Sequence, residues 1–239
     1  MAVYKIAKMN IACSPRYEYT RNYLREYETD ETEYELKIEV TDEMIAYEHR
    51  INQEIHGDPM ADSLCESVAI LRVICDYIID RRGFFLHCSC LKFEEKAIIF
   101  TAPSGTGKST HTRLWREYLK DQVEMINDDK PLVREEDGIF TIFGTPWDGK
   151  HHIGNNISAP IGAVFFLKQA KENKVEKVDS VTALTLLLQQ TVIPKTKGAL
   201  QILLDMLSRL IETVPMYELS CNISYDAVEK ALEAVKSKE

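Results

Sequence analysis

The amino-acid sequence predicts an α/β protein with a small α+β region at its N-terminus. From residue 84 onward, short apolar segments typical of buried strands alternate with segments whose apolar residues recur every three or four positions, as in helices. The residues before this point differ, because two strand-like runs, 3–13 and 34–40, are followed by two helical patterns. We therefore expect an N-terminal region over residues 1–82 and a larger α/β domain over residues 83–239.

Composition and charge indicate a globular protein that binds neither nucleic acid nor membranes. Apolar residues make up 45% of the chain, enough for a sizeable core, and the net charge of −9 opposes binding to nucleic acid or anionic lipid. No apolar run approaches the roughly 20 residues that span a bilayer, and the N-terminus lacks the apolar stretch of a signal peptide. These features predict a cytoplasmic protein. The cysteines show neither a CxxC pair nor a zinc-ligand spacing, so we expect buried thiols.

Local signals set the limits of the elements in the N-terminal region. Segment 18–35 is rich in Glu and Tyr and predicts an exposed connection between strands. Thr41 is suited to cap a helix that Gly57 would stop. A second, structural helix is predicted over 61–81, with Gly83 as its C-cap.

The larger domain alternates strands and helices, with β-hairpins inserted into the core. One hairpin turn is expected over 135–138. Helices are expected over 108–120, 181–190, 199–214 and 225–236. Strands are expected over 84–91, 97–101, 123–126, 132–134, 139–143, 161–167 and 216–219.

A glycine-rich loop between a buried strand and a helix carries the strongest functional signal. It follows the phosphate-loop pattern GxxxxGK[ST], with Ala102 in place of the first glycine. Glycines let the backbone aim successive N–H groups at phosphate oxygens, the lysine reaches the β- and γ-phosphates, and the hydroxyl of Ser109 is suited to bind Mg²⁺. The loop predicts a P-loop nucleotide-binding core that uses ATP and Mg²⁺. Its expected phosphate ligands are Ser104, Gly105, Thr106, Gly107, Lys108, Ser109 and Thr110.

Two adjacent carboxylates follow the next buried strand. Asn127-Asp128-Asp129 follows strand 123–126, about 20 residues beyond the loop. In P-loop proteins a carboxylate at the end of a neighbouring strand holds Mg²⁺, and a second carboxylate can accept the proton of an incoming hydroxyl. Asp also favours turns, so a purely structural cap is the alternative.

The order of these motifs resembles the catalytic domain of HPr kinase/phosphorylase, a family whose nucleotide-binding core is shared with ATP-dependent phosphoenolpyruvate carboxykinases. Phe85-Leu86-His87, the glycine-rich loop and Ile126-Asn127-Asp128-Asp129 stand in the family's order, and the resemblance covers residues 84–167. It implies phosphorylation of a serine with ATP and Mg²⁺, with Asp128 as general base and Asp129 as a metal-site carboxylate, or with these two roles exchanged. It also implies that His87 lies near the phosphate site, whereas a lone strand histidine is otherwise more often a core residue.

The family's signature segment is absent, and residues 144–152 stand in its place. The chain therefore resembles the broader group of HPr kinase-like proteins, some of which modify peptides or small molecules. This loop is rich in side chains that can bind a ligand or take part in a reaction: Trp147, Asp148, Lys150 and two histidines. We interpret the segment as an acceptor-binding loop in which Lys150 neutralises charge on the transferring phosphoryl group and Asp148 positions a hydroxyl or Mg²⁺. The alternative is a solvated turn with Trp147 packed on the core.

Other residues near these motifs are weaker candidates. His111 and Trp115, on the helix after the loop, are expected to pack in the core. Four basic residues could touch phosphates or serve only as structural or surface charges; they are Arg113, Lys130, Arg134 and Lys195.

Together these features predict a kinase that transfers the γ-phosphate of ATP to a hydroxyl group. The expected acceptor is a serine of a peptide or protein, or a small-molecule alcohol, and a homo-oligomer is compatible with the sequence. One alternative is a nucleotide-binding sensor or scaffold without phosphotransfer, which would not need the acidic pair. The other is carboxykinase-like transfer to a small molecule, with a transition metal that Lys150, His151 and Asp148 could hold.

Overall fold

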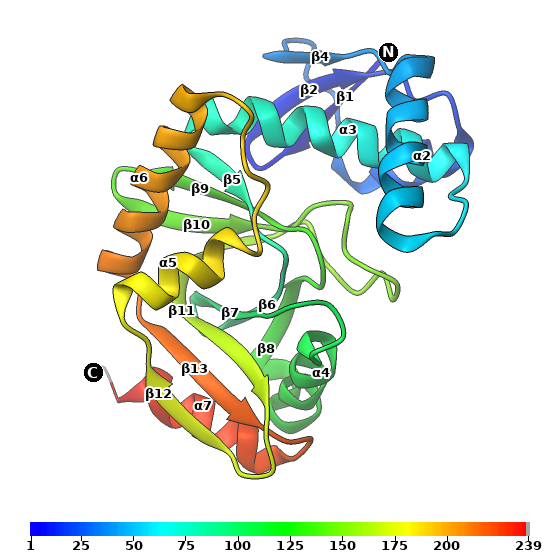
Figure 1. The fold of residues 1–239 in the computed structure, drawn as a ribbon. Helices are drawn as coiled ribbons and strands as arrows, with labels where there is room; N and C mark the ends of the chain where they lie inside the picture. The colour runs from blue at the N-terminus through cyan, green and yellow to red at the C-terminus, as the bar shows by residue number, and fades with distance from the viewer. Residues whose placement is uncertain (238–239) are drawn as a thin grey trace. The chain divides into compact units, whose positions relative to one another are not determined.

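The computed structural model describes residues 1–237, and the chain forms two compact units, Met1–Ile78 and Ile79–Glu239 (Figure 1). Both units combine helices with β-strands, which confirms the mixed α/β class. No helix in the described part of the chain is both long and apolar enough to cross a membrane.

The N-terminal unit packs a small sheet against helices. The sheet has the strand order β3-β1-β2-β4, with β1 and β2 antiparallel and β4 parallel to β2. Its strands are β1 (Ala2–Ile6), β2 (Met9–Cys13), β3 (Glu28–Thr29) and β4 (Leu36–Ile38). The helices are α1 (Glu18–Leu24), the short 3-10 turn η1 (Arg25–Tyr27), α2 (Asp42–His56) and α3 (Asp62–Ile78).

Segment 18–35 was expected to be an exposed connection, and this expectation is wrong because it contains α1 and β3. The fully buried carboxylate of Glu66, on α3, accepts hydrogen bonds from the backbone N–H groups of Arg16 at 2.7 Å and Tyr17 at 3.2 Å. These bonds hold the chain where α1 begins, and Leu24 buries the apolar face of the helix. The acceptor lies some 50 residues away in the sequence, so no local pattern reveals it.

The two longer helices of this unit begin and end close to their predicted limits. Thr41 caps α2 by accepting the N–H of Met44 at 3.3 Å, and Gly57 ends it in the left-handed conformation, with φ of 76°. Gly83 is not the C-cap of α3. The helix passes into η2 (Ile79–Arg81), Arg82 adopts the positive φ of 56°, and Gly83 already belongs to a strand.

The second unit is built on a curled sheet with strand order β5-β9-β10-β11-β7-β6-β8. The long strand β11 also pairs in parallel with β13, which carries β12 on its other edge. The strands are β5 (Gly83–Phe85), β6 (Cys88–Phe93), β7 (Lys96–Thr101), β8 (Val123–Asn127), β9 (Leu132–Glu136), β10 (Ile139–Phe143), β11 (Ser158–Gln169), β12 (Lys174–Lys177) and β13 (Met216–Cys221). The helices are α4 (Lys108–Leu119), the 3-10 turn η3 (Lys120–Gln122), α5 (Ser180–Leu188), α6 (Lys197–Thr213) and α7 (Tyr225–Lys236).

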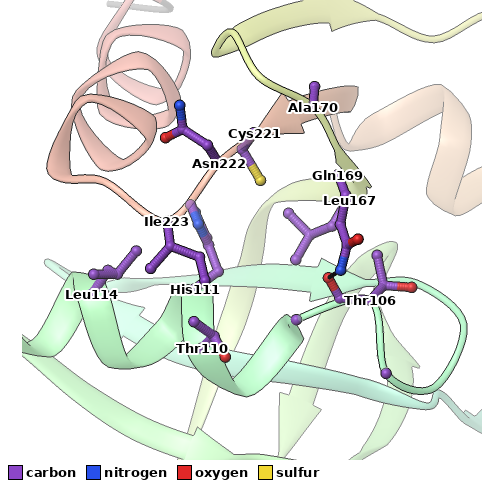
Figure 2. Close-up of a pocket in the computed structure, with 12 residues that line it drawn as sticks. Thr106, Thr110, His111, Leu114, Leu167, Gln169, Ala170, Cys221, Asn222 and Ile223 are labelled. Carbon is purple, nitrogen blue, oxygen red and sulfur yellow. Dashed lines mark hydrogen bonds between the residues drawn. The ribbon is translucent and has the colours of Figure 1, made fainter.

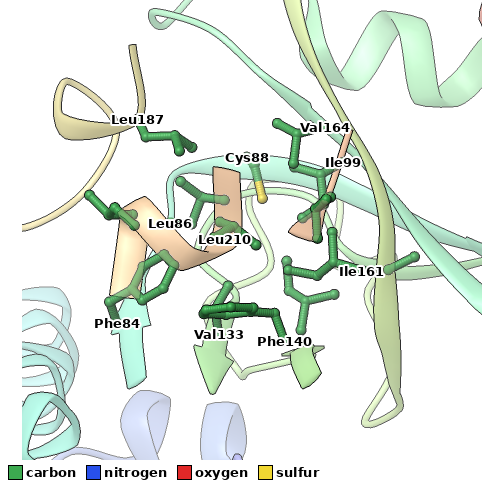
Figure 3. Close-up of a cluster of buried hydrophobic side chains, with 14 of the residues drawn as sticks. Phe84, Leu86, Cys88, Ile99, Val133, Phe140, Ile161, Val164, Leu187 and Leu210 are labelled. Atoms are coloured by element: carbon green, nitrogen blue, oxygen red, sulfur yellow. The ribbon is translucent and has the colours of Figure 1, made fainter. Parts of the chain in front are cut away.

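Helices cover both faces of this sheet, so its central strands are buried on both sides. Along β11, Val164 and Phe166 pack with α5 and α6, whereas Phe165 and Leu167 pack with α4 and α7. Figure 3 shows the first of these cores, in which Leu187 and Leu210 lie over strand residues. Burial on both faces explains why these strands appear in the sequence as continuous apolar runs.

Two strand predictions are corrected by the structure. The single strand expected over 84–91 is divided into β5 and β6, because the N–H of Leu86 bonds to Pro131 O and the N–H of His87 bonds to Gln190 O. Strand β12 was not predicted, since this polar edge strand pairs only with β13 and buries no apolar face. The hairpin turn between β9 and β10 is confirmed, with positive φ at Asp137 and Gly138.

Candidate functional site

The functional motifs of the sequence gather at one edge of the larger sheet. Strand β6 lies between β7 and β8 and runs antiparallel to both, with Cys88 opposite Thr101 and Cys90 opposite Asn127. The ends of β7 and β8 therefore lie at the same edge as the start of β6. The glycine-rich loop (residues 102–109) follows β7, the acidic turn (residues 127–130) follows β8, and His87 precedes β6.

The glycine-rich loop leaves the backbone N–H groups at the start of α4 available. Gly105 and Gly107 have φ values of 79° and 116°, which side-chain-bearing residues rarely adopt. Gly107 is the N-cap residue of α4, and no side chain of the described chain caps this end of the helix. Unpaired N–H groups and the positive end of the helix dipole favour an anion here.

Lys108 points its charge into this loop. The residue is 8% exposed, and its Nζ donates to the carbonyl oxygen of Ala102 at 2.8 Å. Burial lowers the pKa of its ammonium group, although nearby acidic groups oppose that shift. Among the described residues, the only other acceptor of this ammonium group is the carbonyl oxygen of Pro103, at 3.5 Å. A buried cation held by carbonyl oxygens alone would gain from an anion in the loop.

Asp128 lies against the start of α4. It is 6% exposed, and its Oδ1 accepts a hydrogen bond from the buried hydroxyl of Ser89, which is 2.9 Å from the hydroxyl of Thr112. Burial raises the pKa of the Asp128 carboxyl and outweighs the hydrogen bonds from Ser89 and Ser109, which lower it. The carboxylate and the predicted metal ligand Ser109 are therefore direct neighbours.

Asp129 has different neighbours. Its Oδ1 lies 3.3 Å from Nε2 of His87, and its Oδ2 forms an ion pair with Lys130. Burial alone would raise the pKa of the Asp129 carboxyl, but the hydrogen bond from His87 and the charge of Lys130 together lower it. His87 is held from its other side by Gln190, whose Oε1 is 3.1 Å from Nδ1.

Asn127 organises the acidic turn, a role that the sequence analysis missed. Its Oδ1 accepts the backbone N–H groups of Asp129 at 2.9 Å and Lys130 at 2.8 Å. Its Nδ2 donates to the carbonyl oxygen of Thr145 at 3.0 Å, which ties the turn to the segment after β10. An asparagine directly before a turn is a known local signal for this arrangement, so the sequence did contain the clue.

The predicted acceptor loop, residues 144–152, has one end next to the acidic turn. The N–H of Lys130 donates to the carbonyl oxygen of Trp147 at 3.0 Å, and Trp147 is buried. The Asp148 carboxylate is occupied within its own loop, by His152 Nδ1 at 2.9 Å and the N–H of Gly154 at 3.0 Å. Lys150 is exposed and forms no hydrogen bond or ion pair with any described residue.

The remaining candidates fall into two groups. His111 and Trp115 pack in the core as predicted, with Trp115 Nε1 donating to His111 Nε2 at 3.0 Å. Arg113 and Arg134 form ion pairs with neighbouring glutamates, whereas Lys130 is paired with Asp129 in the site. Among residues 1–237, no group of three or more His, Cys, Asp or Glu side chains is arranged to hold a metal ion by itself.

A pocket of about 390 Å³ adjoins the glycine-rich loop on the side away from the carboxylates (Figure 2). It was not predicted, because its walls come from segments far apart in the sequence. They are the loop and α4, with Gly105, Thr106, Gly107, Thr110, His111 and Leu114; the end of β11, with Leu167, Gln169 and Ala170; and the end of β13, with Cys221, Asn222 and Ile223.

Comparison with known proteins gives little further information. No family model matches the chain, and no curated protein matches its sequence. Among solved structures, the chain is similar to the HPr(Ser) kinase/phosphatase from Coxiella burnetii, with 10% sequence identity and a TM-score of 0.36 over 63% of this chain and 92% of that chain. A similarity of this size assigns neither a family nor an activity, so function has to be inferred from the residues of the site.

Proposed function

We propose that this protein is an ATP- and Mg²⁺-dependent kinase that transfers the γ-phosphate to a hydroxyl group, on a serine of a peptide or protein. One observation carries the proposal. The buried Lys108 in the glycine-rich loop and the carboxylates of Asp128 and Asp129 lie at the same edge of one sheet. This combination supplies both a phosphate site and the acidic groups that phosphoryl transfer to a hydroxyl requires.

Each group has a proposed role that follows from its position. The N–H groups of the loop and the ammonium group of Lys108 bind the phosphate oxygens, with a phosphate oxygen taking the place of Ala102 O. Asp128 accepts the proton of the acceptor hydroxyl while the new O–P bond forms and the bond from the γ-phosphorus to the bridging oxygen breaks. His87 and Lys150 are proposed to stabilise charge on the transferring group.

The donor atoms at this edge fit Mg²⁺, which prefers oxygen ligands. Ser109 and Asp129 would hold the ion, and its charge would offset the negative charge of the phosphates. The hydrogen bond between Ser109 and Asp128 favours the exchanged assignment, with Asp128 on the metal and Asp129 as base. Both assignments use the same set of residues, and variants can separate them.

The test is incubation of the purified protein with Mg²⁺ and γ-labelled ATP, together with the small peptides and proteins encoded beside its gene. We expect label on a serine, and we expect Lys108→Ala to abolish it. Asp128→Asn should retain nucleotide binding and suppress transfer, whereas the exposed Asp121→Asn should transfer as the wild type does. Unchanged turnover in Lys108→Ala would refute the mechanism.

Two further outcomes have a defined meaning. If Asp128→Asn loses the Mg²⁺ dependence of ATP binding while Asp129→Asn keeps it, the two carboxylates have exchanged roles. If ATP binds tightly and no acceptor is labelled, the protein is a nucleotide sensor or scaffold rather than a kinase.

A further inference from the structure

The pocket beside the glycine-rich loop lies opposite the carboxylates. The loop follows β7, which has β6 and then β8 on one side, and β11 and then β13 on the other. Asp128 and Asp129 follow β8, whereas the pocket is lined by the ends of β11 and β13. A ligand whose phosphates bind in the loop, with its terminal phosphate toward the carboxylates, would extend its other end into this pocket.

The pocket has the size and surface of a small-molecule site. Its volume of about 390 Å³ lies within the usual range of about 300–1,000 Å³ for ligand pockets. Leu114 on α4, Leu167 on β11 and Ile223 after β13 give it apolar walls (Figure 2). Ile223 is 74% exposed, so its side chain is accessible to a molecule at the mouth of the pocket.

His111 adds a buried hydrogen-bond donor to this apolar surface. It is 3% exposed, and its Nε2 accepts the indole N–H of Trp115 at 3.0 Å. An imidazole nitrogen that accepts an N–H carries no proton, so the proton of the ring is on Nδ1. No described residue accepts a hydrogen bond from this Nδ1–H, which is the polar group that His111 can offer to a molecule in the pocket.

We propose that this pocket binds the base of the nucleotide, with His111 Nδ1–H donating to an acceptor atom of the base and with Leu114, Leu167 and Ile223 packing on its ring. The inference rests on the proposed function, because the loop must hold the phosphates of the same molecule. The pocket would give a nucleoside triphosphate an affinity that the triphosphate group alone does not have.

The thiol of Cys221 allows a direct test in the unmodified protein. Cys221 lines the pocket and is half-buried, whereas Cys13, Cys65, Cys75, Cys88 and Cys90 are buried. The protein is treated with a maleimide at mildly alkaline pH, and labelling of Cys221 is followed by peptide mass spectrometry. With Mg²⁺ and ATP at about 100 times its Kd, about 1% of the protein is unliganded, so labelling should slow about 100-fold.

Inorganic tripolyphosphate separates the two proposals. Its binding and that of ATP are measured by calorimetry in the presence of Mg²⁺, and each is then tested for protection of Cys221. Binding of both with protection by ATP alone supports a base in the pocket. If both ligands bind but ATP does not protect Cys221, or tripolyphosphate protects it equally well, this inference is overturned and the proposed phosphate site stands. If neither binds, the proposed function itself fails.

A surface substitution gives a second, independent measurement. Ile223→Glu places a charge at the mouth of the pocket on an exposed residue, so the fold is retained. It should weaken ATP binding about tenfold and leave tripolyphosphate binding nearly unchanged. Val181→Glu is the matched control, because Val181 is 77% exposed on α5 and does not line the pocket. Equal ATP affinity in the Ile223 and Val181 variants would contradict the inference.

Discussion

Replacement of Asn127 by alanine removes the side chain that holds the acidic turn in place. Asn127 is fully buried, and its amide group makes hydrogen bonds to three different residues. In Asn127→Ala the N–H of Asp129 loses its acceptor and the carbonyl oxygen of Thr145 loses its donor, whereas the N–H of Lys130 keeps the carbonyl oxygen of Trp147 as acceptor. Little water can replace these bonds, because the site of the amide is closed to solvent.

The expected loss of stability follows from these contacts. A buried polar group left without its partner costs about 1–3 kcal/mol, so the N–H of Asp129 alone predicts a loss of about 1–3 kcal/mol, to which the carbonyl oxygen of Thr145 adds. Asn173 is a suitable control, because it also joins two loops but is half-buried: its Oδ1 accepts the N–H of Asn222 and its Nδ2 donates to Asp226. Water can replace these bonds, so Asn173→Ala should cost only about 0.5–1.5 kcal/mol.

Urea denaturation followed by tryptophan fluorescence measures this difference. Both tryptophans, Trp115 and Trp147, belong to the unit Ile79–Glu239, so the signal reports the unfolding of the unit that contains Asn127. Hydrogen exchange adds a local measurement, since the amide of Asp129 should exchange faster in the Asn127 variant, whereas the amide of Lys130, which keeps its bond to Trp147 O, should change less. A free energy of unfolding within about 0.5 kcal/mol of the wild-type value would refute this account of the turn.

Two other predictions concern packing and pH. A Cβ at Gly144 would lie 2.0 Å from the backbone oxygen of Asn155, so Gly144→Ala should cost about 1–3 kcal/mol or more in urea denaturation. Gly198→Ala, on α6 with open space around it, should instead stabilise by up to about 1 kcal/mol. Burial lowers the pKa of His111 from 6.5 to about 4, so the unfolded chain binds a proton that the folded chain does not, and stability falls as the pH drops between these values. The loss is on the order of 3 kcal/mol; it should be absent in His111→Gln and retained in the exposed control His151→Gln.

Elements with local signals were predicted from the sequence with small errors in their limits. Thr41 and Gly57 define α2, because a side-chain oxygen at one end and a left-handed residue at the other act on groups within four residues of themselves. The continuous apolar runs of β7 and β11 were recognised because both faces of these strands are buried. The glycine-rich loop was recognised because its residues are contiguous in the sequence.

Features that depend on distant segments were missed or misplaced. Helix α1 was not predicted, because the carboxylate that holds its start comes from Glu66 on another helix. The break between β5 and β6 depends on Pro131 and Gln190, which are bonded to the backbone of residues 86 and 87. Neither partner is close enough in the sequence to change a local pattern.

The sequence by itself determined the α/β class and the position of the glycine-rich loop, since strand burial leaves periodic or continuous apolar patterns and the residues of the loop are contiguous. Only the tertiary structure decided which groups meet. Asp129 is paired with His87 and Lys130, Asp128 lies beside Ser109, and the donor of His111 lines a pocket closed by β11 and β13. Such contacts depend on strand order and on the direction of each strand, and these are set by the packing of the whole sheet rather than by any single segment.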